Sequence, residues 1–235
     1  MMAKSSSAGQ LPLAFEHDPA SGRDDLIVSE SLRGAVTMID RWPEWPSPVV
    51  ILAGPTGSGK SHIASIWADR TAAHRVNLQA RSDEAIAAAA AGPVVIEDVD
   101  RTAYDETALF HLINALRAHG TTALMTARQF PAGWNVRLPD LASRLKAATV
   151  VEIGEPDEEL LAQVMVKLFA DRQINVDDRI VHWLVARMER SLAAVRHIVD
   201  RLDQLALARG SKITRALAAE ALSRMDNGAP DIEPS

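Results

Sequence analysis

The chain has 235 residues, which is long enough to bury a sizeable hydrophobic core in one or two domains. It carries 25 Lys and Arg residues against 31 Asp and Glu residues, and the net charge of −6 argues against a protein that coats DNA or membranes through bulk positive charge. The absence of cysteine excludes disulfides, cysteine–zinc sites and thiol catalysis. No signal peptide and no apolar run of membrane-spanning length is visible, so we expect a cytoplasmic protein.

Both ends of the chain are predicted to be tails. Residues 1–22 are rich in Ser, Ala, Gly, Pro and Asp, and residues 228–235 have a similar composition without a helical period. One short apolar island interrupts the first tail at residues 10–15, with the sequence QLPLAF.

Between the tails, strands alternate with helices as far as residue 154. Short apolar runs predict strands at residues 49–53, 75–78, 94–97, 122–126 and 150–153. Capping residues and apolar periodicity predict helices at residues 60–71, 82–91 and 105–119. This alternation is typical of βαβ units, so residues 23–154 are predicted to form an α/β domain with a parallel sheet.

After residue 154 the pattern predicts helices without strands. The first helix starts at Asp157, the second spans residues 177–188, and Ser191 and Thr214 each cap a further helix. Residues 155–227 are therefore predicted to form a small all-α domain.

Residues 54–61, GPTGSGKS, match the phosphate-binding motif GxxxxGK[ST], and they lie between a predicted strand and a predicted helix. Glycines allow backbone N–H groups to surround phosphate oxygens, and the helix N-terminus adds partial positive charge. A lysine in this motif reaches the terminal phosphates and the following hydroxyl holds Mg²⁺. We therefore predict a site for ATP or ADP; the alternative is a glycine-rich turn without a ligand. The predicted binding residues are Gly54, Pro55, Thr56, Gly57, Ser58, Gly59, Lys60, Ser61 and His62.

Two acids follow the predicted strand at residues 94–97, as in a Walker B motif. Glu97 occupies the place of the Mg²⁺-binding acid, with Ser61 as the other metal ligand, and Asp98 occupies the place of the acid that polarises water. The alternative is a solvent-facing acidic turn. Thr126 ends the next predicted strand and is a candidate γ-phosphate sensor, although Thr is common at strand ends.

These motifs, in this order and followed by helices, resemble the AAA+ ATPases. The segment at residues 138–145, LPDLASRL, is similar to that of DnaA-type replication initiators and especially to that of the Hda branch, the regulatory inactivators of DnaA. The resemblance makes Arg144 an arginine finger that reaches the nucleotide of a neighbouring subunit. Without the resemblance, a structural salt bridge is the simpler explanation of this arginine. It also places Ile27 against adenine and suggests Arg196 as the lid arginine, one turn after Ala193, which occupies the usual position.

Residues 10–15 resemble the sliding-clamp-binding motif of the same branch. Pro12 favours an extended chain, the apolar side chains can fill a pocket, and an amide can bond at its rim. The alternative is an island that folds back on the domain. The predicted clamp-binding residues are Gln10, Leu11, Pro12, Leu13, Ala14 and Phe15.

The resemblance implies a nucleotide-bound regulator of replication initiation. Its expected partners are the sliding clamp (the polymerase III β subunit) and DnaA, with a possible homo-oligomer, no membrane, and DNA only indirectly through the clamp. Between residues 78 and 94 there is room for only one helix, and the chain stops after the lid, so we expect neither the initiator's insertion nor its DNA-reading domain.

Three other functions are compatible with the same motifs. The chain could be an adaptor like the helicase loaders, a small-molecule P-loop kinase, or a nucleotide-dependent scaffold. A kinase would need an acceptor pocket under an arginine-rich lid, whereas the predicted helices after residue 155 have apolar stripes.

Overall fold

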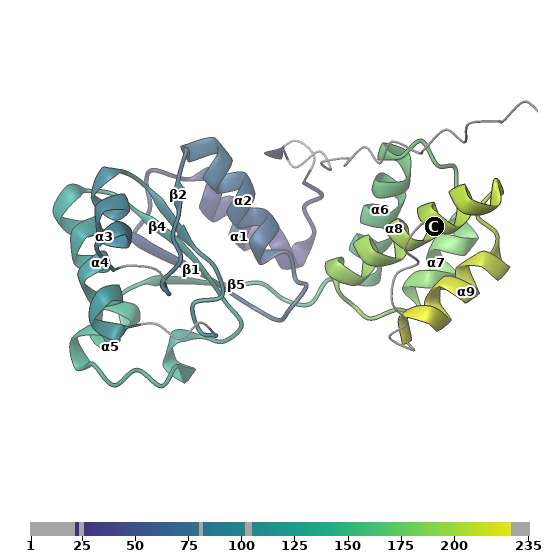
Figure 1. The fold of residues 1–235 in the computed structure, drawn as a ribbon. Coiled ribbons are helices and arrows are strands. Elements are labelled where there is room, and N and C mark those ends of the chain that lie inside the picture. Colours follow the sequence, from purple (N-terminus) through teal and green to yellow (C-terminus); the bar gives the residue numbers. More distant parts are fainter. Residues whose placement is uncertain (1–21, 24–25, 80–81, 102–104, 227–235) are drawn as a thin grey trace, which may run out of the picture.

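A parallel sheet forms the centre of the first part of the chain. The computed structural model describes residues 22–23, 26–79, 82–101 and 105–226; both predicted tails, except Gly22, and the island at residues 10–15 lie outside these ranges. The sheet has the order β2-β3-β4-β1-β5, all pairs are parallel, and helices lie on both sides of it (Figure 1). This confirms the predicted α/β class. The strands are β1 (Val49–Ala53), β2 (His74–Arg75), β3 (Val94–Ile96), β4 (Ala123–Ala127) and β5 (Thr149–Glu152).

Each face of the sheet has its own hydrophobic core. In β1, Val50 and Leu52 face one core and Val49 and Ile51 face the other, because successive side chains of a strand point to opposite faces. The first core is completed by α1 (Glu30–Asp40) and α2 (Lys60–Thr71). The second is completed by α3 (Ser82–Ala91), α4 (Glu106–His119) and α5 (Pro139–Lys146).

The second part of the chain is a bundle of helices with a core of its own (Figure 1). Its helices are α6 (Glu158–Asp171), α7 (Asp178–Val185), α8 (Leu192–Arg209) and α9 (Arg215–Asp226). The predicted caps are confirmed: the side chains of Asp157 and Ser191 accept hydrogen bonds from backbone N–H groups in the first turns of α6 and α8. In the part of the chain that is described, no helix has the length and apolar character needed to cross a membrane.

Three local predictions differ from the structure. The strand expected at residues 75–78 is reduced to the two residues of β2, because the Asn77 side chain accepts a hydrogen bond from the N–H of Gln79 and so turns the chain away. The helices α1 and α5 were not predicted. In α1 the buried residues recur at helical spacing, but small side chains interrupt the apolar stripe. The buried residues are Leu32, Ala35, Val36 and Ile39.

The cap of α6 allows a stability test. Asp157 Oδ1 accepts a 2.7 Å hydrogen bond from the N–H of Leu160. We expect Asp157→Ala to lower the free energy of unfolding by about 1 kcal/mol, because the first turn of α6 loses this acceptor. Urea denaturation measures the change. Glu155→Ala removes the same charge from the preceding loop and is the control; equal losses in both variants would show that charge, not capping, is responsible.

Candidate nucleotide site

The predicted phosphate-binding loop lies between β1 and α2, at the carboxyl end of the sheet, where ligands of such folds bind. Glycine is required at its start, because a Cβ on Gly54 would lie 2.1 Å from the carbonyl oxygen of Ile153. Glycine is also favoured at Gly57 and Gly59, where φ is 74° and 101°. The loop therefore has the curled backbone that the motif predicts.

Lys60 is held inside this loop. Its side chain is buried, and Nζ donates to the carbonyl oxygens of Gly54 at 2.7 Å and Pro55 at 2.6 Å. Burial holds the pKa of Lys60 below its usual value, while the carboxylate of Asp98 opposes this change and the Arg128 guanidinium adds to it. The ammonium group is thus held by two carbonyl oxygens of the loop, and Lys60 lines a cavity beside the loop.

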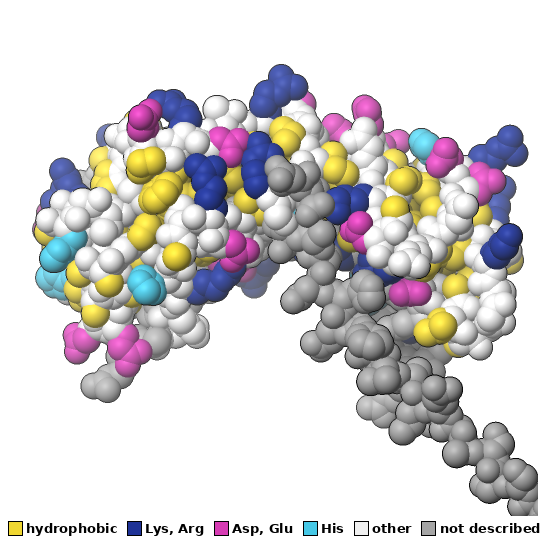
Figure 2. Space-filling model, turned by 90° about the horizontal axis from the view of Figure 1, so that it is seen from above, with side chains coloured by type: hydrophobic (Ala, Val, Ile, Leu, Met, Phe, Trp, Pro, Cys, Tyr) yellow, Lys and Arg dark blue, Asp and Glu magenta, His cyan; other side chains and the backbone are white. Residues whose placement is uncertain are grey.

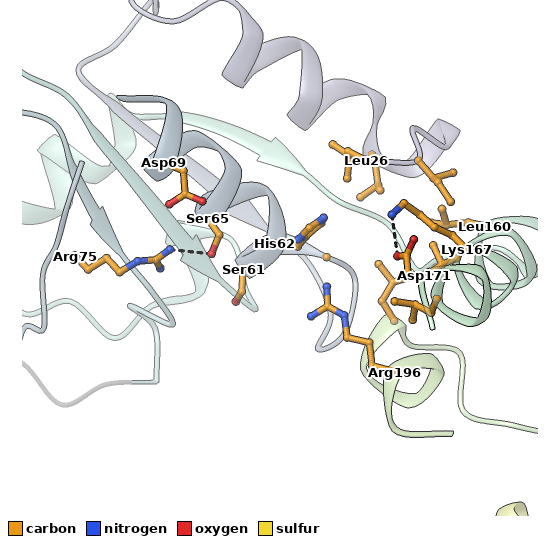
Figure 3. A pocket seen from close by; sticks show the side chains of 16 residues that line it. Leu26, Ser61, His62, Ser65, Asp69, Arg75, Leu160, Lys167, Asp171 and Arg196 are labelled. Carbon is orange, nitrogen blue, oxygen red and sulfur yellow. Dashed lines mark hydrogen bonds and ion pairs between the residues drawn. The ribbon is translucent and has the colours of Figure 1, made fainter. Parts of the chain in front are cut away.

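A cavity of about 340 Å³ opens where the α/β part meets the helical part. Ile27 lines it, and Figure 3 shows side chains from both parts around it. Its apolar wall comes from the segment before α1, from α1 itself, and from α6 and α8; these residues are Leu26, Ile27, Leu32, Leu160, Val164, Leu168 and Leu192. Charged side chains complete the lining: Asp69, Arg75, Lys167, Asp171 and Arg196. A cavity of this size with an apolar wall and a few polar groups is typical of a small-molecule site.

A second cavity, of about 210 Å³, adjoins the first at the loop. The two share Ser61, His62 and Arg196 among their lining residues. Lys60, Asp98 and Arg128 line the second cavity but not the first. The two cavities therefore meet at the loop and the first turn of α8.

The helical part contacts the loop directly. The N–H of Leu192 donates a 2.8 Å hydrogen bond to the carbonyl oxygen of Gly57, and a Cβ on Gly57 would lie 2.3 Å from that of Ser191. This contact brings the first turns of α8 to the site. Arg196 is exposed and extends from α8 towards Ser61 and His62 (Figure 3). The structure thus places the predicted lid arginine at the cavity.

The two predicted Walker B acids point in different directions. Asp98 lines the cavity beside Lys60, in a left-handed conformation with φ of 49°. Glu97 instead pairs with Arg75 at 3.0 Å, and Arg75 also donates to Ser65 Oγ. In this structure Asp98 is the acid at the phosphate loop, and Glu97 lines neither cavity.

Thr126 is placed differently from the predicted sensor position. It is fully buried, and its Oγ1 accepts a 2.9 Å hydrogen bond from the N–H of Asp98. Its role in this geometry is to hold the backbone of Asp98 in the left-handed conformation. Arg128, two residues later, is the side chain from this strand end that reaches the cavity, and no motif in the sequence indicates it.

Arg144 lies on α5 and is not among the residues that line either cavity. The start of α5 is fixed by Glu106, whose carboxylate accepts hydrogen bonds from the N–H groups of Arg137 and Leu138. These bonds hold the pKa of Glu106 below its usual value. No hydrogen bond or ion pair joins the Arg144 guanidinium to another residue of the described ranges. The structure thus gives no support to the salt-bridge explanation.

The site fits an adenine nucleotide. The loop is curled as phosphate binding requires, a buried ammonium faces it, and Ser58 Oγ is buried without a hydrogen-bond partner among the described residues. Ser61 and Asp98 both line the smaller cavity and offer the oxygen ligands that Mg²⁺ prefers. Lys60, Ser61 and the loop N–H groups would hold phosphates, and the apolar wall beside Ile27 would hold the base.

Similar structures share this architecture. Domain III of the replication initiation protein DnaA from Thermotoga maritima superposes with a TM-score of 0.73 at 15% identity, covering 91% of this chain and 99% of that one. A mutant of RuvB from the same organism gives a TM-score of 0.69 at 15% identity, with 87% and 72% covered. The chain has the AAA+ fold. A DnaA bound to AMPPCP and single-stranded DNA has the same fold, with a TM-score of 0.65 at 15% identity and 90% and 69% covered.

Comparison by sequence says less about the chain than comparison by structure. No protein family model matches the chain. An uncharacterized protein of Haemophilus influenzae is 29% identical over 103 residues, which span 43% of this chain and 45% of that relative.

Proposed function

We propose that this chain is a nucleotide-bound AAA+ regulator that binds the DNA sliding clamp and stimulates ATP hydrolysis by the DnaA initiator. The observation that carries the proposal is the position of Arg144. Its guanidinium is held on a fixed helix, has no partner among the described residues, and does not line the chain's own nucleotide cavities. A guanidinium so placed is suited to a phosphate on another protein, where it neutralises charge on the transferred phosphoryl group.

The chain's own nucleotide would have a structural role in this proposal. It would lie between the two parts of the chain, in contact with the loop and with α8, and it would strengthen the connection already made by Leu192 and Gly57. The likeness to DnaA domain III supports a partner of the same fold. Two AAA+ modules can pack so that the helix that carries Arg144 in this chain faces the nucleotide of the other module.

Access to DNA would come through the clamp. The described face in Figure 2 mixes Lys and Arg with Asp and Glu side chains and shows no extended basic patch, and such a patch is the usual mark of direct binding to nucleic acid. The segment at residues 10–15 is the proposed clamp-binding element.

The test follows hydrolysis of DnaA-bound ATP after adding this protein, with and without clamp loaded on DNA. We expect hydrolysis to accelerate only when both are present. Acceleration without the clamp would contradict the clamp part of the proposal. Capture of the replicative helicase instead of the clamp, with no effect on DnaA, would favour the helicase-loader alternative.

The clamp-binding element gives a separate prediction. We expect the double variant Leu11→Ala, Phe15→Ala to weaken clamp affinity at least tenfold, because a few apolar anchors carry most of the energy in such short motifs. Surface plasmon resonance with immobilised clamp measures it. Leu207→Ala removes a leucine that is 77% exposed on α8 and is the control. Unchanged affinity in the double variant would exclude residues 10–15 as the element.

A further inference from the structure

Two arginines of the helical part are held on one aromatic ring. The guanidinium carbon of Arg187 lies 4.7 Å from the ring centroid of Trp183, and that of Arg215 lies 5.3 Å from it. Trp183 lies on α7, Arg187 follows the end of that helix, and Arg215 opens α9. Because α7 and α9 pack side by side (Figure 1), segments that are distant in the sequence bring two cations to one place on the surface.

The ring positions both guanidinium groups without neutralising them. A guanidinium over an indole is attracted by the π electrons, and its N–H groups stay available to acceptors at its edge. Arg187 also donates a 3.1 Å hydrogen bond to the carbonyl oxygen of Trp183. Both arginines are exposed, whereas Trp183 is partly buried against the core of the helical part. The two cations are thus held at defined positions and remain accessible to a ligand.

Neither of these two guanidinium groups has a carboxylate partner in the part of the chain that is described. Other exposed arginines of the helical part do have one. Arg190 pairs with Glu158 at 2.7 Å. Arg209 pairs with Glu220, also at 2.7 Å. Two like charges on one ring repel each other, and a ligand with two neighbouring negative charges would remove that repulsion.

The surroundings of the ring add positive charge. Arg179 is exposed and lies four residues before Trp183, so it shares the same face of α7. The N-terminus of α9 contributes partial positive charge, and its first turn contains no acid. Asp178 and Glu189 are the exposed acids of residues 178–190, and neither forms an ion pair with these arginines. The surface around Trp183 is therefore suited to an anionic partner.

We propose that Arg187 and Arg215 bind neighbouring phosphates of a DNA backbone. Guanidinium groups donate paired hydrogen bonds to phosphate oxygens. A protein partner would need two acids placed side by side, whereas DNA presents neighbouring anions along its whole length. So few cations cannot hold DNA by bulk charge in a chain of net charge −6. The contact would therefore assist the proposed clamp-binding element once the clamp has brought the chain to the duplex.

The test measures binding of the full chain to a fluorescein-labelled DNA duplex by fluorescence anisotropy at several salt concentrations, without clamp or DnaA. We expect weak binding at low salt. The double variant Arg187→Ala, Arg215→Ala should bind about tenfold more weakly at about 50 mM salt. The slope of log affinity against log salt should fall by about two, because two phosphate contacts are lost. The double variant Arg190→Ala, Arg209→Ala removes the same charge from arginines that pair with acids, and it should keep the wild-type slope.

Three results would overturn the inference. Equal losses in the two double variants would show that net charge is responsible and not the pair on Trp183. A wild-type chain that does not bind the duplex at low salt would remove the contact altogether. Polyglutamate that displaces the duplex at an equal concentration of negative charge would show that the surface takes acidic protein as readily as phosphates. Because the assay contains neither clamp nor DnaA, failure of the proposed function leaves its result unchanged.

Discussion

Arg144→Ala is expected to abolish the stimulation of DnaA-bound ATP hydrolysis, with a loss on the order of a thousandfold in the catalytic effect. A guanidinium that reaches the transferred phosphoryl group donates two parallel hydrogen bonds and neutralises developing charge, and alanine supplies neither. Arg144→Lys should restore only a small part, because an ammonium cannot make the same two-pronged contact. Single-turnover hydrolysis of radiolabelled ATP on DnaA, with clamp-loaded DNA present, measures the rate.

Two controls separate the finger from an indirect effect. Lys146→Ala removes an exposed cation two residues further along α5 and should leave the rate unchanged. Clamp affinity of Arg144→Ala should also be unchanged, because the proposed clamp-binding element lies in a different segment. A variant that still stimulates hydrolysis as the wild type does would exclude Arg144 from the reaction.

The features that could be predicted from the sequence are those that depend on residues close together in the chain. The limits of α4 were predicted closely, since Asp105 caps its first turn and Gly120 adopts the left-handed conformation after its last. The phosphate loop was equally accessible, because its glycines and Lys60 act within one short segment. The parallel sheet followed from the alternation of elements.

The directions of side chains at strand ends could not be predicted in the same way. Glu97 and Asp98 are adjacent, but only the structure shows that Arg75 holds the first while Thr126 turns the backbone of the second towards the cavity. Arg128 reaches the cavity because β4 lies beside β1, which is a tertiary contact. Such positions depend on which strands are neighbours, and the order β4-β1-β5 is not written in any short motif.

The second large effect concerns Lys60. We expect Lys60→Met to weaken both ADP and AMPPCP about a hundredfold, because the ammonium group makes charge-assisted contacts to phosphates and methionine keeps only the apolar stem. Titration with a fluorescent ADP analogue measures the loss. Lys212→Ala, an exposed lysine beyond α8, is the control. Affinity within about threefold of wild type would contradict phosphate binding at this loop.

The pH dependence of binding gives Lys60 an independent signature. Burial holds the pKa of its ammonium group below that of an ordinary lysine. As the pH rises through that lowered pKa, the free protein loses the charge that phosphate binding uses, so nucleotide affinity should fall at a lower pH than for an ordinary lysine. A bound phosphate stabilises the protonated form, and binding in this range should therefore take up protons from the buffer. Calorimetry in buffers of different ionisation enthalpy detects that uptake. In Lys60→Met the uptake should vanish; if it persists unchanged, another group is the source and Lys60 does not face the phosphates.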